Sequence, residues 1–239
     1  MNLLELSDVS RSFGALKVTA AVSFGVPRGQ ALGIIGPNGA GKSTLFNLIT
    51  GNIRPDQGRI TLAGQDVTRR PAMDRVRMGV GRSFQIPQPF EGLTVYENLA
   101  VAASFGQGRS EAAVVEDCVR ILHDTELMRL ANTPAGALSL LDRKRLELAR
   151  AMATGPELLL LDEIAGGLTE GECKALVATI KRLHGQGMTI IWIEHVLHAL
   201  TAVVEQLLVL DFGRVIGVGA PDDIMASRAV REIYLGIEA

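Results

Sequence analysis

One short stretch constrains this chain more than any other. It reads Gly36-Pro37-Asn38-Gly39-Ala40-Gly41-Lys42-Ser43 and fits the pattern G-x-x-x-x-G-K-[ST]. The apolar residues 31–35 before it predict a buried strand, and residues 43–49 after it predict the first turns of a helix. A strand, a glycine loop and a helix in this order form a phosphate cradle, because backbone N–H groups and the helix N-terminus converge on one anion. Lys42 would reach the β- and γ-phosphates, and the Ser43 hydroxyl would bind Mg²⁺.

Composition narrows the class of protein. The 239 residues include 24 Lys and Arg and 26 Asp and Glu, and the net charge of −2 argues against a nucleic-acid binder. No secretion segment and no run of about 18 apolar residues is present, so we expect another polypeptide to hold the chain at any membrane. Cys118 and Cys173 have no partner at metal-ligand spacing and are expected to be unreactive thiols in a reducing cytosol.

Strand and helix patterns alternate along the chain. Strands are predicted at residues 3–9, 17–26, 59–63, 80–85, 158–162, 189–194, 207–211 and 214–218. Helices are predicted at residues 71–78, 173–180, 222–227 and 229–235. Thr94 with Glu97 predicts a capping box that starts another helix. A further helix is expected to bury an apolar stripe of Val115, Val119 and Leu122.

These patterns predict one α/β domain with a mostly parallel sheet, a phosphate-loop NTPase core and an antiparallel β edge. Hydrophobic content of 47% with 4% aromatic residues fits the aliphatic core of such a sheet. We expect the core to comprise residues 1–85 and 156–220. Residues 86–155 would form an inserted helical subdomain, and residues 221–239 would form C-terminal helices.

Polar residues follow three of the predicted strands. Asp162 ends the strand of four leucines and could hold Mg²⁺ opposite Ser43. Glu163 would lie beside the γ-phosphate, placed to activate a water. His195 and Gln85 end two further strands at the same sheet edge, where open α/β sheets bind ligands. His195 is expected to contact the γ-phosphate, and Gln85 to contact both Mg²⁺ and the attacking water.

Taken together, these residues resemble the ATP-binding subunits of ABC transporters, and the resemblance covers essentially the whole chain. It rests on residues 36–44, on Ser83-Phe84-Gln85, on residues 158–163 and on His195. The resemblance implies an ATPase that uses ATP and Mg²⁺, with Glu163 as the catalytic glutamate and His195 as the switch histidine. By the same likeness, Phe13 would stack on adenine. The implied nucleotide-binding residues of the loop are Gly36, Pro37, Asn38, Gly39, Ala40, Gly41, Lys42, Ser43 and Thr44.

Within that family the chain is most similar to the ATPases of branched-chain amino acid uptake systems. The matching segments are Arg82-Ser83-Phe84-Gln85, Thr94-Val95-Tyr96-Glu97-Asn98-Leu99 and Tyr234-Leu235-Gly236, with the phosphate loop continuing through Leu45-Phe46-Asn47. Lipopolysaccharide-export ATPases are similar too. The solute is therefore open between amino acids, amide or urea uptake and lipopolysaccharide export.

The likeness breaks at surfaces that would face a partner subunit. The family's signature loop, Leu-Ser-Gly-Gly-Gln, appears here as Leu138-Ser139-Leu140-Leu141-Asp142. Ser139 can still cap a helix and contact the partner's nucleotide, but two leucines hinder close approach of backbone to phosphate. Arg143 and Lys144 are expected either to offset the charge of Asp142 or to lie exposed. The family's proline after the glutamate is Ile164, and the acid or amide of its dimer-contact loop is Thr169.

The resemblance implies a chain that binds Mg-ATP, pairs with a non-identical ATPase subunit and powers an importer. It would lie at the cytoplasmic face of the membrane against permease subunits, contacted through residues 86–90 and the helical insert. A solute-binding protein would be an indirect partner. Two alternatives are a non-transport ABC protein and a phosphate-loop kinase or GTPase. The first usually has long coiled-coil insertions or two ATPase halves, and a GTPase would need an N-K-x-D-type segment. The chain has none of these features.

Overall fold

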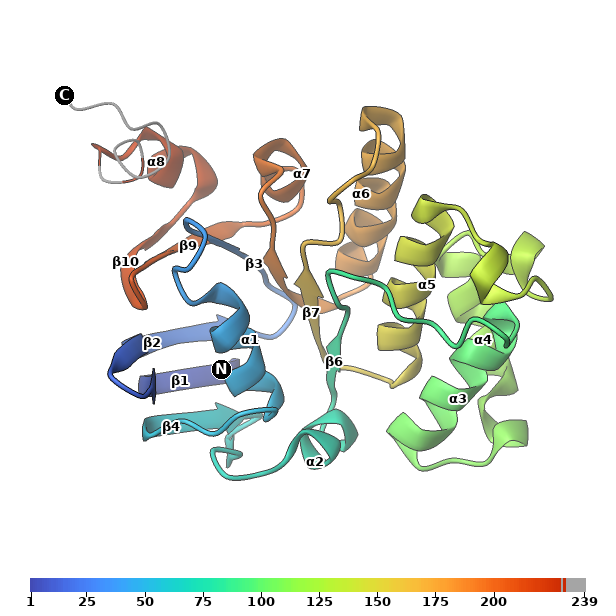
Figure 1. Cartoon of the computed structure of the whole chain (residues 1–239), viewed down its shortest axis with the longest axis horizontal. Helices are drawn as coiled ribbons and strands as arrows, with labels where there is room; N and C mark the ends of the chain where they lie inside the picture. Colours follow the sequence, from blue (N-terminus) through green and yellow to red (C-terminus); the bar gives the residue numbers. More distant parts are fainter. Residues whose placement is uncertain (229, 231–239) are drawn as a thin grey trace.

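Two β-sheets and a group of helices make up this computed structural model, which describes residues 1–228 and 230 (Figure 1). The larger sheet has the strand order β10-β9-β3-β8-β7-β6. Its strands from β9 to β6 are parallel, and β10 is antiparallel to β9. The strands are β3 (Ala31–Ile35), β6 (Val80–Arg82), β7 (Leu158–Asp162), β8 (Thr189–Ile193), β9 (Gln206–Asp211) and β10 (Arg214–Gly219).

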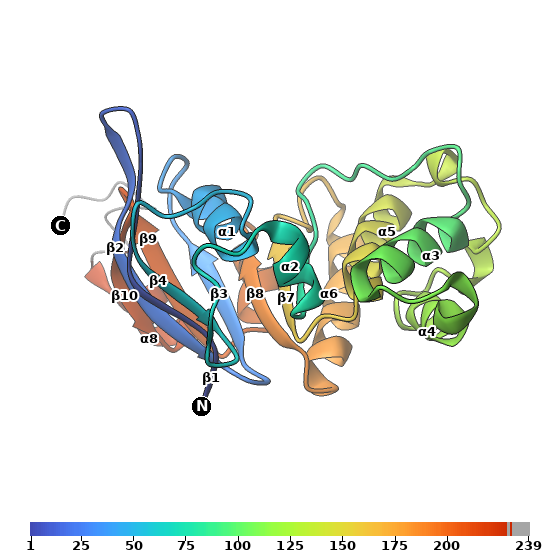
Figure 2. The same cartoon turned by 90° about the horizontal axis from the view of Figure 1, so that it is seen from below.

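The smaller sheet is the antiparallel edge, with the strand order β2-β1-β4-β5. Helix α1 (Lys42–Thr50) lies between the two sheets (Figure 2), where Leu45, Phe46 and Leu48 pack in one cluster with residues of both sheets. The strands of this sheet are β1 (Asn2–Phe13), β2 (Leu16–Pro27), β4 (Gln57–Leu62) and β5 (Gln65–Asp66).

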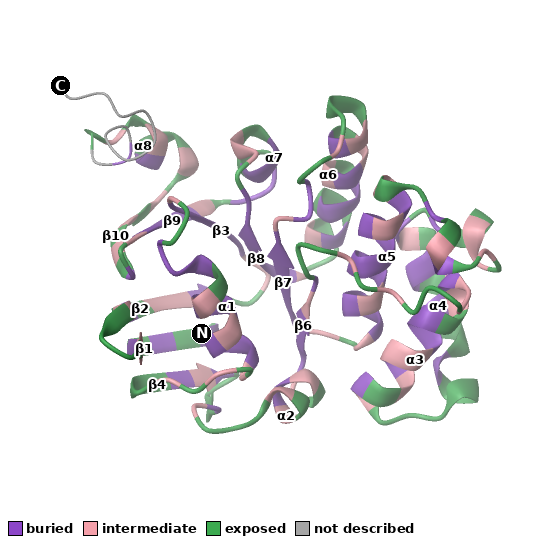
Figure 3. Ribbon diagram, viewed as in Figure 1, coloured by how far each residue is buried: buried purple, intermediate pink, exposed green. Residues whose placement is uncertain are grey.

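Every residue of β3, β7 and β8 is buried, which confirms the apolar strands predicted at the centre of the sheet (Figure 3). The strand predicted at 80–85 is too long. Strand β6 ends at Arg82, and the chain turns after Ser83, whose N–H still donates to the Leu160 carbonyl oxygen of β7 at 2.9 Å. The next N–H, that of Phe84, donates to Glu147 Oε1 at 3.3 Å. This turn carries Gln85 out of the sheet toward the end of β7.

Helices α3 to α5 lie together at one end of the molecule (Figure 1), and the division of the chain into core and inserted subdomain remains a prediction. None of the helices in the described residues is long and apolar enough to cross a membrane. The helices are α2 (Ala72–Arg77), α3 (Val95–Gln107), α4 (Glu111–Asp124), α5 (Leu140–Ala153), α6 (Glu170–Gly185), α7 (Leu197–Thr201) and α8 (Pro221–Ala226), with the short 3₁₀ helices η1 (Met128–Leu130) and η2 (Ala135–Ala137).

The capping box at Thr94 and Glu97 is confirmed at the start of α3. The stripe expected on the next helix is wrong in register, because α4 buries Val114, Cys118, Ile121 and Leu122 and leaves Val115 exposed. Spacings of four, seven and eight residues place this set on one helix face. Helix α8 confirms the helix predicted at 222–227, and the one predicted at 229–235 lies, except for residue 230, outside the described residues.

A fully buried arginine supports the end of the phosphate-loop helix. Arg75 Nη1 donates to the carbonyl oxygens of Leu48 (2.7 Å) and Ile49 (2.8 Å), which lie in the last turn of α1. Its other nitrogens donate to the carbonyl oxygens of Arg70 (3.0 Å) and Thr68 (3.2 Å). Burial lowers the pKa of Arg75 to about 10, so the guanidinium stays charged at neutral pH.

Replacing Arg75 with Met is expected to lower the free energy of unfolding by about 3 kcal/mol, because two buried and two partly buried carbonyl groups lose their donor. Urea denaturation followed by circular dichroism measures this loss. Arg77→Met on the exposed face of the same helix is the matched control and should leave stability nearly unchanged. Equal stability of the two variants would contradict the role of Arg75.

Candidate functional site

The glycine loop lies between the end of β3 and the start of α1, as predicted. Gly39 and Gly41 have φ values of 82° and 100°, which are left-handed conformations that side chains disfavour. A Cβ atom on Gly41 would lie 2.5 Å from the carbonyl oxygen of Val18, so only glycine fits there. The backbone therefore has the shape that a phosphate cradle requires.

Lys42 is buried beneath this loop. Its Nζ donates to the carbonyl oxygens of Gly36 (2.7 Å) and Pro37 (3.0 Å). Burial lowers the pKa of the amine, and the nearby carboxylates of Glu163 and Asp162 oppose this change. The loop thus holds a positive charge beside two acids, where phosphate and a metal ion would meet.

The loop opens into a surface pocket of about 330 Å³. Glu163 reaches this pocket from the end of β7, so the predicted catalytic glutamate and the phosphate loop share one space. Two apolar residues of β2 complete the lining. The residues that line it are Leu16, Val18, Asn38, Gly39, Ala40, Gly41, Lys42, Ser43, Thr44 and Glu163.

Asp162 ends β7 and is paired with Arg82, for which the sequence analysis predicts no role. Arg82 Nη2 lies 2.7 Å from Asp162 Oδ2, and its Nη1 donates to Asn47 Oδ1 at 2.6 Å. The guanidinium lies 4.9 Å from the ring centroid of Phe84. Arg82 therefore links the phosphate-loop helix, the magnesium candidate Asp162 and the turn that carries Gln85.

Oxygen donors for a metal gather in an adjoining pocket of about 420 Å³, whose lining includes Ser43, Gln85 and Asp162. In the described residues no cluster of three His, Cys, Asp or Glu side chains could hold a metal ion. Mg²⁺ does not need one, because it keeps several waters and binds through one or two carboxylates together with substrate phosphates. One hydroxyl, one amide oxygen and one carboxylate therefore fit Mg²⁺ bound with a nucleotide.

The structure brings together the three side chains predicted to act on water. Gln85 Nε2 donates to Glu163 Oε2, and His195 Nε2 lies 2.7 Å from Glu163 Oε1. Glu163 has a φ of 45°, which is uncommon for a residue with a side chain. A carboxylate oriented by an amide and an imidazole beside a phosphate pocket can accept a proton from a water.

Two predicted nucleotide contacts lie outside the phosphate pocket. Phe13 ends β1 and is exposed, with the Arg11 guanidinium carbon 5.0 Å from its ring centroid. Ser139 is the N-cap of α5, where its Oγ accepts the N–H of Asp142 at 3.2 Å. The roles of Phe13 toward adenine and of Ser139 toward a partner's nucleotide therefore stay predictions.

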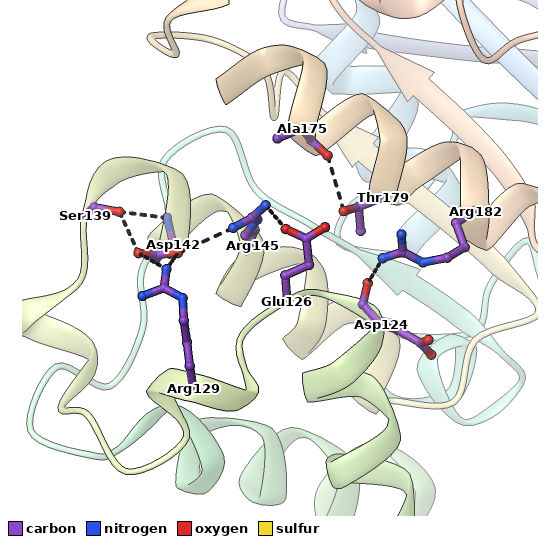
Figure 4. A network of polar contacts seen from close by, with 9 residues as sticks. All are labelled: Asp124, Glu126, Arg129, Ser139, Asp142, Arg145, Ala175, Thr179 and Arg182. Carbon is purple, nitrogen blue, oxygen red and sulfur yellow. Dashed lines mark hydrogen bonds and ion pairs between the residues drawn. The ribbon is translucent and has the colours of Figure 1, made fainter. Parts of the chain in front are cut away.

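Asp142 is held by a polar network at the start of α5 (Figure 4). The Ser139 hydroxyl donates to Asp142 Oδ2 at 2.8 Å. Arg129 Nη2 and Arg145 Nη1 lie 3.3 Å and 3.7 Å from Asp142 Oδ1, and Arg145 also pairs with Glu126. The Ser139 hydroxyl is thus already engaged within the chain.

Both expectations for the two basic residues after Asp142 are wrong. Arg143 donates to the carbonyl oxygens of Leu138 (3.1 Å) and Gly136 (2.8 Å), and Lys144 is buried. Neither residue offsets Asp142 because both side chains bond to main-chain carbonyl groups. Arg129 and Arg145 provide the offsetting charge instead.

The remaining departures have local structural roles. Thr169 is the N-cap of α6 and forms a capping box with Glu172. Leu140 is exposed in the first turn of α5, where the family has glycine.

Cys118 and Cys173 are buried, and burial raises the pKa of both thiols, as expected for unreactive cysteines.

Comparison with known proteins identifies the family of this chain. The ABC transporter family profile matches residues 19–166. The high-affinity branched-chain amino acid transport ATP-binding protein BraF of Pseudomonas aeruginosa is 35% identical, with 98% of each chain covered. The lipopolysaccharide export ATP-binding protein LptB of Haemophilus influenzae is 30% identical over 99% of this chain and 98% of its own.

A crystal structure of an ATP-binding cassette of an ABC transporter in its ADP conformation superimposes with a TM-score of 0.90 at 31% identity, covering 99% of this chain and 100% of that one. The sequence profile, the two relatives and the shared fold all point to ATP-binding subunits of ABC transporters. The chain therefore belongs to the ABC transporter family, as an ATP-binding subunit that hydrolyses ATP.

Proposed function

We propose that this chain powers the import of branched-chain or related amino acids from the cytoplasmic face of a membrane. The observation that carries its catalytic role is Glu163, held by Gln85 and His195 at the mouth of the phosphate pocket. The amino acid assignment rests on the likeness to the branched-chain transport protein of Pseudomonas aeruginosa. The likeness to the export protein of Haemophilus influenzae makes lipopolysaccharide export the second candidate.

Hydrolysis follows from the positions of these groups. The loop backbone and Lys42 bind the phosphates of ATP, and the N-terminus of α1 adds partial positive charge. Ser43, Asp162 and Gln85 would hold Mg²⁺, which neutralises charge on the phosphate oxygens when it is bound.

Glu163 accepts a proton from the water that attacks the γ-phosphate, and ADP and phosphate leave. The Gln85 amide nitrogen orients Glu163 Oε2, which leaves the amide oxygen of Gln85 for the metal or the water. His195 orients the other carboxylate oxygen, Glu163 Oε1. The three side chains thus position one water against one phosphate.

A second, non-identical ATPase subunit is proposed to complete the site. The phosphate loop and the Glu163 cluster of this chain provide the groups that would bind its own phosphates and activate a water. The start of α5 is less suited to a partner's nucleotide, because the Ser139 hydroxyl donates to Asp142 and Leu140 is exposed where glycine would allow close approach. Two copies of this chain would each meet that poor surface, whereas a different subunit could offer a better one.

Permease subunits are proposed to dock near residues 86–90. Ile86 is 70% exposed, and Phe84 and Phe90 beside it are also exposed. Next to them lies a mostly apolar pocket of about 210 Å³ formed by residues of α1, α2, β6, α3 and α5, so a partner there would contact both the core and the helical insert. A solute-binding protein would meet the permease, and no nucleic acid is involved.

Replacing Ile86 with Asp is expected to prevent co-purification of the permease, because a charge would enter an apolar interface. The measurement is affinity purification of the tagged chain from detergent-solubilised membranes, followed by identification of the retained subunits. Phe212→Asp is the matched control, since Phe212 is 85% exposed in the turn between β9 and β10. Equal recovery of permease with both variants would exclude this docking surface, and an absent permease with the unaltered chain would favour a non-transport role.

A further inference from the structure

Two buried charged side chains lie directly behind Glu163. Lys144 comes from α5 and is 4% exposed, and Glu194 follows β8 and is 1% exposed. Burial of a charge is costly unless the charge is paired and hydrogen-bonded. Burial lowers the pKa of Lys144, and the nearby carboxylates, Glu194 first among them, oppose this change.

The Lys144 amine holds the backbone of two catalytic candidates. Its Nζ donates to the carbonyl oxygen of Gln85 at 2.7 Å and to that of Glu163 at 3.4 Å. The side chains of Gln85 and Glu163 are hydrogen-bonded to each other. One ammonium group therefore fixes the main chain on both sides of that hydrogen bond.

The Glu194 carboxylate holds the backbone of His195, the third catalytic candidate. Its Oε1 accepts the N–H groups of His195 (3.0 Å) and Val196 (3.4 Å), and its Oε2 accepts the N–H of Ala165 (3.0 Å). Ala165 is the second residue after Glu163. One carboxylate therefore fixes the backbone of His195 and of the segment that follows Glu163.

The two charges hold this segment from both sides. Lys144 binds the carbonyl group of Glu163, and Glu194 binds the N–H of Ala165. The Glu163 N–H also donates to the Ile193 carbonyl oxygen at 2.8 Å. Such fixation matters here because Glu163 has an uncommon positive φ, and surrounding contacts must maintain that conformation.

We propose that Lys144 and Glu194 are positioning residues for ATP hydrolysis. They hold the backbone so that the side chains of Gln85 and His195 meet the two oxygens of Glu163. The inference rests on the proposed role of Glu163 as the base that activates water. Neither residue lines the phosphate pocket, so both are expected to act on the rate of hydrolysis and not on ATP binding.

Lys144→Met removes the amine at similar length, and Glu194→Gln removes the charge at similar volume. Single-turnover hydrolysis of radiolabelled ATP by the complex purified with its membrane subunits should slow about 10- to 100-fold in each variant. The Kd for ATP should change by less than about threefold. Lys174→Met is the matched control, because Lys174 is exposed on α6 and pairs there with the exposed Glu170.

A second background separates positioning from a general loss of structure. When the chain already carries Glu163→Gln, adding Lys144→Met or Glu194→Gln should slow the residual turnover no further, since both residues act through Glu163. Turnover at the unaltered rate, or an equal further loss in the Glu163→Gln background, would overturn the inference. If the Lys144→Met variant does not fold, the Glu194→Gln variant tests the inference by the same criteria. A failure of the proposed function would give a different result. In that case the Glu163→Gln variant alone would turn over ATP at the unaltered rate.

Discussion

Glu163→Gln lowers ATP turnover by about 100-fold or more in our account, while ATP binding survives. A glutamine amide cannot accept the proton of the attacking water. It has nearly the same volume, so it can stay between Gln85 and His195. The groups expected to bind the phosphates, which are the loop backbone and Lys42, are unchanged.

The measurement is the rate of phosphate release at saturating ATP, together with the affinity for ATP, in the complex containing the membrane subunits. Glu170→Gln is the matched control, because Glu170 is an exposed glutamate in the first turn of α6. Its turnover should equal that of the unaltered chain. Unchanged turnover in Glu163→Gln would remove Glu163 from the mechanism, and lost ATP binding would show that Glu163 acts on the ground state.

The parts of the site that the sequence predicts are those encoded in local geometry. The loop at residues 36–43 needs glycine at left-handed positions, and this need leaves a visible pattern. The apolar runs of β7 and β8 place Glu163 and His195 near one another, because the carboxyl ends of neighbouring parallel strands meet at one sheet edge. Gln85 joins them although its strand is shorter than predicted.

The parts that sequence reasoning missed depend on main-chain partners. Lys144 and Glu194 bond mostly to carbonyl and N–H groups, which carry no residue signature. A signal does exist for Lys144, since it lies on the same face of α5 as the buried Leu148 and Ala151. A lysine on an apolar helix face needs a buried acceptor. Glu194 carries a similar signal as the residue that directly follows five buried residues of β8.

The ion pairs of Asp142 show why pairs between residues far apart in the sequence are hard to predict. The sequence predicts that its neighbours Arg143 and Lys144 either offset it or lie exposed, and they do neither. On a helix, residues three apart share a face, so Arg145 is the partner within α5. Arg129 comes from η1, and only the folded chain brings it to Asp142.

A second ATPase subunit is expected to raise the turnover of this chain about 100-fold. A missing donor to a transferring group costs about 100- to 1000-fold in rate. On our proposal the Ser139 hydroxyl is such a missing donor, because it donates to Asp142 instead. The exposed Leu140 adds a steric obstacle at the same helix start. The turnover of the chain alone should therefore rise when three substitutions are combined, namely Leu140→Gly, Leu141→Gly and Asp142→Gln.

The most direct test of the account is ATP turnover by the purified chain over a range of its own concentrations, first alone and then with the ATPase subunit recovered with it from membranes. We predict slow hydrolysis alone and a rise of about 100-fold on addition of the non-identical subunit. Fast hydrolysis by the chain alone, increasing cooperatively with its concentration, would contradict a site completed by a different subunit.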